Sequence, residues 1–165
     1  MLVSFRIQKM RSAGIVIRGD EILLMKRRKN GSGDYYVIPG GSVDAGEDPE
    51  TAAVREIKEE TTVEVTIDRL LYTHVYTDLD ARSFFFLCMY VSGEPSLSKT
   101  SEEYWDMQIR DTYYEPCWVP LQSLGTLPVF PVEIRDALIR DVTRGFPSEP
   151  QTTELKSTEL ITLEV

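Results

Sequence analysis

The stretch GSVDAGEDPETAAVREIKEETTV, residues 41–63, holds the densest group of chemically informative side chains in the chain. Asp48 followed by Pro49 predicts a helix start, because aspartate caps a helix N-terminus and proline fits the first helical position. The helix is expected to run to about Glu60, with Ile57 on its apolar face.

Three glutamates of this helix, Glu56, Glu59 and Glu60, are spaced i, i+3 and i+4. This spacing puts them on one face within a single turn, where like charges repel. A bound cation would offset the repulsion. Oxygen ligands without a nearby histidine or cysteine cluster favour Mg²⁺, with Mn²⁺ as the alternative. A plain solvated helix face is the competing interpretation of these three residues taken alone.

Apolar segments on both sides of the helix predict a β-sheet. Residues 12–18 and 21–26 are joined by Gly19-Asp20, which indicates a hairpin. Further strands are expected at residues 35–38, 62–67, 70–76, 82–91 and 113–119, and a second helix at about 131–142. This order predicts an α/β fold in which a mixed sheet is flanked by a helix on each face.

Two segments are polar. Residues 93–112 are long and acidic, so we expect a functional loop there. Residues 146–165 are rich in Pro, Ser, Thr and Glu and are expected to form a loosely ordered tail behind a domain of residues 1–145. Residues 160–165 are a weak candidate for one more strand.

Composition bounds the function. A chain of 165 residues, 42% apolar and 27% charged, suits one globular domain. Its net charge of −9 argues against a polynucleotide partner, although a small phosphorylated ligand can dock through cations. We find no membrane span or signal peptide, and interpret Cys88 and Cys117 as free thiols of a cytoplasmic protein, with a disulfide as the alternative.

The full spacing of residues 41–63 resembles the Nudix signature G-x5-E-x7-R-E-U-x-E-E-x-G-U, where U is a bulky aliphatic residue. The matching residues are Gly41, Glu47, Arg55, Glu56, Ile57, Glu59, Glu60 and Val63. Thr62 departs from the pattern, because it stands where the signature has its last glycine. We expect a changed helix cap there, since Thr62 supplies no metal ligand.

The resemblance implies an α/β/α sandwich that cleaves X-linked nucleoside diphosphates by water attack at phosphorus. It implies metal binding by Glu56, Glu59 and Glu60, with the Gly40 carbonyl as a further ligand. Arg55 is expected to hold these carboxylates by charge-assisted hydrogen bonds, and Glu47 to satisfy the loop or pair with Arg55.

The general base has several candidates. Glu56 and Glu59 lie within the box, and in many family members a carboxylate from a later loop serves instead. Residues 93–112 offer Asp111, ranked first, and Glu103, ranked second, ahead of Glu102 and Asp106. Each of these acids is also compatible with a plain surface position.

Substrate contacts are expected near the box. Arg27 or Arg28 is a candidate for binding phosphate, with a solvated strand end as the alternative. Tyr36, like Tyr35 and Phe86, is a candidate for stacking on a base, with core packing as the default. A nucleoside triphosphate or a nucleotide sugar is the favoured substrate. The branch of the family that acts on oxidised nucleotides binds the modified guanine through an asparagine near the start of the last helix, and the absence of an asparagine there in this chain argues against such a substrate. A non-catalytic nucleotide-binding domain is the alternative, and a homodimer stays open.

Overall fold

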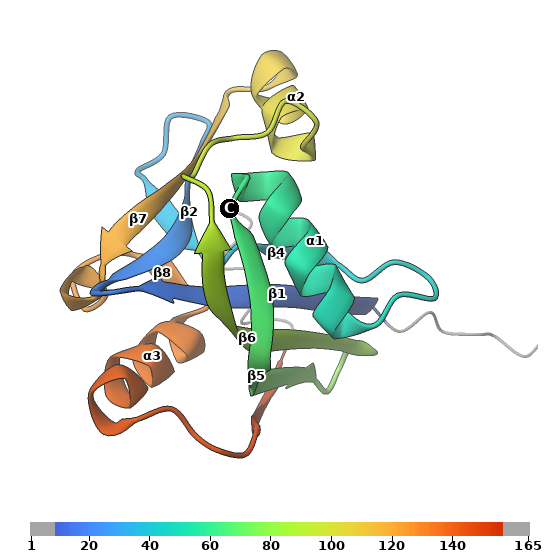
Figure 1. Cartoon of the computed structure of the whole chain (residues 1–165). Coiled ribbons are helices and arrows are strands. Elements are labelled where there is room, and N and C mark those ends of the chain that lie inside the picture. The colour runs from blue at the N-terminus through green and yellow to red at the C-terminus, as the bar shows by residue number, and fades with distance from the viewer. Residues whose placement is uncertain (1–8, 157–165) are drawn as a thin grey trace, which may run out of the picture.

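The computed structural model describes residues 9–156, which form a sheet covered by helices on both faces (Figure 1). β1 (Lys9–Arg18) and β2 (Glu21–Lys29) form the predicted hairpin, with Gly19 at a φ of +61° in the turn. Their antiparallel pairing is confined to the turn, where Ile17 lies opposite Ile22. Beyond it β1 runs parallel to β6 and also pairs with β4, so the sheet divides along β1.

The strand order is β8-β3-β2-β1-β6-β5-β9, with β4 paired to β1 and β7 paired to β2. The remaining strands are β3 (Tyr35–Val37), β4 (Gly40–Ser42), β5 (Glu64–Tyr76), β6 (Ala81–Ser92), β7 (Thr112–Pro120), β8 (Val129–Phe130) and β9 (Gln151–Leu155). Both parallel and antiparallel pairs occur, so the prediction of a mixed sheet is confirmed.

The two long helices lie on opposite faces of the sheet. α1 (Pro49–Thr61) buries Ala53 and Ile57 against one face, in a cluster with Val16 and Leu23. α3 (Val132–Arg144) buries its apolar side in a second cluster on the other face, with Ile15, Leu24, Ile134, Ala137 and Leu138 among its members. Consecutive strand residues alternate between the two clusters, as the pleat requires. The structure confirms the α/β/α sandwich.

Residues 93–112 are not all loop, which corrects the sequence-based expectation. They contain α2 (Glu102–Ile109), whose N-terminus is capped by the Ser101 side chain. No residue of α2 is buried, and its eight residues are too few to show the longer apolar periodicity that predicted α1 and α3. A short 3-10 turn, η1 (Leu121–Ser123), follows β7.

The tail is also more ordered than expected. β9 pairs in parallel with β5, with Thr153 opposite His74. Four of its five residues are exposed, so backbone pairing and not side-chain burial supports it. The candidate strand at residues 160–165 lies outside the described residues. Cys88 and Cys117 are free, in line with the prediction of thiols. No helix within residues 9–156 is long and apolar enough to span a membrane.

Candidate active site

Helix α1 packs closely against β1, and this contact sets how far the helix lies from the sheet. A Cβ on Gly14 would come within 2.1 Å of the Ile57 Cδ1 atom, so a side chain at this position would displace Ile57. At the helix N-terminus, the Ser12 hydroxyl donates to the Pro49 carbonyl. The Asp48 carboxylate accepts from the Thr51 amide at 2.9 Å, as the predicted cap requires.

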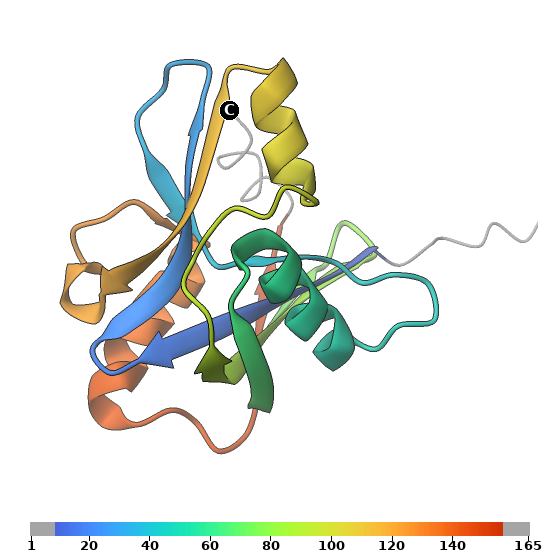
Figure 2. The same ribbon diagram turned by 45° about the horizontal axis from the view of Figure 1, so that its top comes forward.

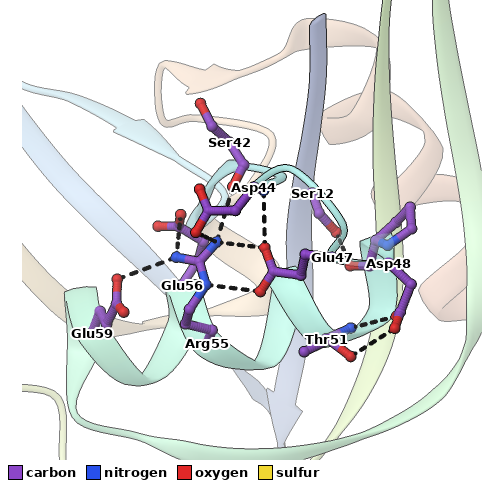
Figure 3. A network of polar contacts seen from close by, with 10 residues as sticks. Ser12, Ser42, Asp44, Glu47, Asp48, Thr51, Arg55, Glu56 and Glu59 are labelled. Carbon is purple, nitrogen blue, oxygen red and sulfur yellow. Dashed lines mark hydrogen bonds and ion pairs between the residues drawn. The ribbon is translucent and has the colours of Figure 1, made fainter. Parts of the chain in front are cut away.

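Arg55 is the centre of a carboxylate network on this helix (Figure 3). Its Nε and Nη2 donate to the two Glu47 oxygens at 2.8 and 2.9 Å, which is the bidentate geometry of strong ion pairs. Its Nη1 donates to Glu56 at 2.8 Å and to Glu59 at 3.3 Å. The Arg55 guanidinium lowers the pKa of Glu47 to about 2. Glu47 therefore pairs with Arg55 and, by accepting from the Asp44 amide, also closes the loop.

Two adjacent glycines bring backbone and carboxylates together. A Cβ on Gly41 would lie 2.3 Å from Glu56 Cδ, so the Glu56 carboxylate occupies the space of the missing side chain. The Gly40 amide donates to Glu60 Oε2 at 3.2 Å. The Gly40 carbonyl, a predicted metal ligand, accepts from the Arg11 guanidinium at 3.3 Å.

Glu60 is the most deeply buried acid of the box, at 4% exposure. Burial raises its pKa well above the usual range; the charges of Glu103 and Glu56 add to the rise, and Arg27 opposes it. Burial likewise raises the pKa of Glu56, against the effect of Arg55. Buried acids whose neighbours disfavour their charge suit a divalent cation, and carboxylate and carbonyl oxygens suit a hard one.

The three predicted metal ligands do not converge on one point in this arrangement. Glu56 and Glu59 turn toward Arg55 in Figure 3, whereas Glu60 accepts from the Gly40 amide. Within residues 9–156, no three acidic, histidine or cysteine side chains are grouped tightly enough to hold a metal ion as they stand. The donor types fit a cation, and bringing Glu56, Glu59 and Glu60 together around one requires these side chains to rearrange.

The structure places the later acids on different elements, and their ranking as general base stays a prediction. Glu103, on α2, lies near enough for its charge to raise the pKa of Glu56 and Glu60, although burial is the larger cause for both. Asp111 lies at the start of β7, where its carbonyl accepts from the Asn30 amide and its charge acts on Arg28. Of the two, Glu103 is therefore the acid whose charge acts on Glu56 and Glu60.

Arg27 and Arg28 point to opposite faces of β2. Arg28 donates to Asp34 at 2.6 Å and is exposed. Arg27 lies on the α1 face: its guanidinium sits 5.3 Å from the Tyr114 ring centre, and its buried Nε has no hydrogen-bond partner in the described part of the chain. Tyr36 packs on the α3-side cluster, away from Arg27.

Tyr114 lies beside Arg27, and the sequence analysis did not single it out. It stands directly opposite Arg27 in the β2–β7 register, and its hydroxyl donates to Asp106 of α2 at 2.9 Å. Only the pairing of β2 with β7 reveals this contact, because the two residues are far apart in the sequence. Tyr114 thus links the arginine to the helix that carries Glu103.

The family model described as the NUDIX domain matches residues 8–140. The chain belongs to the NUDIX family. This NUDIX domain is 36% identical over 94 residues to an ADP-ribose pyrophosphatase of Methanocaldococcus jannaschii, an alignment that covers 54% of the chain and 56% of that relative. It is 32% identical over 114 residues to the NAD-capped RNA hydrolase NudC of Pseudomonas aeruginosa, which covers 69% of the chain and 37% of the relative.

Solved structures agree on the fold. A NUDIX hydrolase from Nitrosomonas europaea superposes with a TM-score of 0.69 at 15% identity, covering 92% of this chain and 81% of that one. An ADP-ribose pyrophosphatase from Streptococcus suis gives a TM-score of 0.64 at 20% identity, covering 89% and 100%. The chain spans about half the length, or less, of the two curated relatives described above.

Proposed function

We propose that this NUDIX domain is a metal-dependent pyrophosphohydrolase that cleaves a phosphoanhydride bond in a nucleoside diphosphate-linked substrate. The observation that carries the proposal is the Arg55 guanidinium, which gathers Glu47, Glu56 and Glu59 next to the buried Glu60. A non-catalytic domain has no need for this concentration of oriented, mutually repelling acids.

Glu56, Glu59 and Glu60, with the Gly40 carbonyl, would hold the cation. An all-oxygen donor set favours Mg²⁺, with Mn²⁺ as the alternative. When bound, the cation neutralises phosphate charge and makes the attacking water more acidic. Arg55 would orient Glu56 and Glu59 by donating hydrogen bonds to them, which is the contribution expected of a residue behind the ligands.

The other side chains have separate parts in the reaction. Arg27 would donate hydrogen bonds to the phosphate oxygens, since its Nε is buried and lacks a partner among the described residues. Glu103 would accept a proton from the water as its oxygen bonds to phosphorus and the bridging P–O bond breaks. Arg28 is the weaker phosphate candidate, because Asp34 already holds it.

The names of the relatives help to choose between the candidate substrates. Two of them carry the name ADP-ribose pyrophosphatase, in Methanocaldococcus jannaschii and Saccharomyces cerevisiae. A nucleoside diphosphate joined to a sugar is therefore the substrate class that we favour, ahead of a nucleoside triphosphate. The NudC relatives act on NAD-capped RNA, but the net charge of −9 favours a small nucleotide for this chain.

The test is a substrate panel run on the full chain with and without Mg²⁺ or Mn²⁺. The panel contains ADP-ribose, a UDP-sugar, nucleoside triphosphates and NAD-capped RNA, and released phosphate groups are measured. Glu59→Gln should lower kcat on the best substrate at least about tenfold, because it removes a charged ligand. Glu50→Gln, an exposed acid in the first turn of the same helix, is the matched control and should stay within about twofold of the unmodified chain.

Three results would overturn the proposal. These are turnover that does not depend on a divalent cation, an equal effect of the two substitutions, and binding of nucleotides by calorimetry without any cleavage. The last would instead establish a nucleotide-binding module.

A further inference from the structure

Thr62, the departure from the family signature, ends helix α1 in a left-handed conformation. Its φ and ψ are 63° and −2°, and its amide donates to the Lys58 carbonyl at 3.0 Å. A β-branched residue is disfavoured at this backbone geometry, where glycine is the common choice. Retaining threonine here therefore needs a reason in the contacts of its side chain.

The hydroxyl of Thr62 donates to the carbonyl of Glu94 at 2.9 Å, across 32 residues of chain. Next to it, the Ser96 amide donates to the Thr61 carbonyl at 2.9 Å. Gly93 lies so close that a Cβ there would come 2.9 Å from the Thr62 carbonyl oxygen. The C-terminal end of α1 thus holds the first residues of the segment that follows β6.

That segment leads directly to α2 and Glu103. Figure 2 shows it passing the C-terminal end of α1 before it enters α2, which stands beside that end. The far side of α2 is held through the bond from the Tyr114 hydroxyl to Asp106. Arg18 also holds the start of the segment, by donating to the Glu94 carboxylate at 2.7 Å.

We propose that Thr62 is a positioning residue for Glu103. The hydroxyl ties residues 93–101 to the helix that carries Glu56, Glu59 and Glu60, so the box and the later acid keep one spacing. A glycine at this position would relax the backbone and release the tie. The inference rests on the proposed function, in which Glu103 takes the proton from water.

The test compares three substitutions at this position. Thr62→Ser keeps the hydroxyl, Thr62→Val keeps the shape without it, and Thr62→Gly restores the family residue. We expect the valine and glycine variants to lower kcat about tenfold with little change in KM, and serine to restore it, because a misplaced group acts on the transition state. Thermal stability should not follow kcat, since the glycine variant loses backbone strain.

Hydrogen exchange supplies a readout without metal or substrate. Amides of residues 104–109 should exchange faster in the valine and glycine variants than in the serine variant or the unmodified chain. Thr126→Val is the control, because it also removes a hydroxyl that donates to a carbonyl, in the turn after η1. If the exchange rates of these amides are the same in the valine and glycine variants as in the unmodified chain, the Thr62 hydroxyl does not hold this segment and the proposal is wrong.

A double-mutant cycle with Glu103→Gln separates this inference from the proposed function. If Glu103→Gln lowers kcat and Thr62→Val has no further effect in that background, the positioning role is supported. If Glu103→Gln lowers kcat and Thr62→Val alone does not, the positioning role is wrong and the function stands. If Glu103→Gln leaves kcat unchanged, Glu103 is not the base, and Thr62 has no catalytic group to position.

Discussion

At the scale of single residues, absent side chains matter to this site as much as charged ones. The Glu56 carboxylate occupies the space that a Cβ on Gly41 would take, and the Gly40 amide reaches Glu60. The backbone of β4 therefore lies directly against the acids of α1. A side chain at position 41 would displace the Glu56 carboxylate, whereas one at position 40 would collide with the backbone of Ser12 and Ala13.

Gly41→Ala is expected to lower kcat more than about tenfold while leaving the fold intact. The added Cβ would lie 2.3 Å from Glu56 Cδ, and that flexible side chain can rotate away at little cost to stability. Activity and thermal melting, measured on the same preparation, check that kcat falls while stability is kept. Gly33→Ala is the control, since nothing lies within 4 Å of its Cβ position. A large loss of melting temperature with Gly41→Ala would contradict this account.

The sequence predicted those site features that depend on local spacing. The cap at Asp48 and the pairing of Glu47 with Arg55 both follow from residues within one segment. It did not predict α2, so it could not tell that Glu103 lies on a helix whereas Asp111 lies just before β7. Nor could it tell which of Arg27 and Arg28 lies on the α1 face of β2 beside Tyr114, since that depends on the pairing of β2 with a distant strand.

At the scale of elements, α3 is tied to the sheet by a buried polar contact as well as by apolar packing. Asp141, 5% exposed, accepts from the Tyr72 hydroxyl of β5 at 2.7 Å and from Arg140 at 2.6 and 2.9 Å. The hydrogen bonds from Arg140 and, to a smaller extent, from Tyr72 lower the pKa of Asp141, against the effect of burial, which raises it. A buried carboxylate with this many donors fixes how the helix lies on β5.

Asp141→Asn should reduce the free energy of unfolding at neutral pH by about 2 kcal/mol, the usual value of hydrogen bonds to a buried charge. The folded-state pKa lies below the unfolded one, so this stabilisation is complete above about pH 4 and is lost as the pH falls through the folded value. Urea titrations of both proteins between neutral pH and about pH 3 should show that the difference between their free energies of unfolding becomes smaller as the pH falls.

The control for that comparison is Asp136→Asn on the same helix. Asp136 is 61% exposed in its side chain and pairs with Arg135 at the surface, so its loss should change stability by less than about 0.5 kcal/mol. A gap between Asp141→Asn and the unmodified chain that stays constant with pH would show that shape and not charge accounts for the effect.

At the scale of the whole molecule, the last described strand completes the sheet. β9 covers the outer edge of β5, the Leu155 carbonyl accepts from the Thr77 amide, and Arg140 donates to Gln151. Arg69 of β5 also donates to the Pro147 carbonyl. The residues expected to be a loose tail therefore join the fold at its edge, although every residue of the box precedes them.

A chain ending at Phe146 should melt at least about 5 °C below one ending at Lys156, because several hydrogen bonds of about 1 kcal/mol each are lost. The comparison of these two chains isolates the segment that contains β9. Where the shorter chain is folded, its metal-dependent turnover should persist, since α1, β4 and α2 are complete. Equal melting temperatures would show that β9 adds nothing to stability, and lost turnover in a folded chain would make β9 part of the site.

The parallel pairing of β5 with β9 also has a consequence for biosynthesis. A ribosome releases β9 after the other described strands of the sheet, so a nascent chain carries the outer edge of β5 with unpaired amide and carbonyl groups until then. Closing this edge therefore waits for the synthesis of residues 151–155. Translation that stalls before residue 151 leaves β5 as an open edge, on which a strand of another nascent chain can pair.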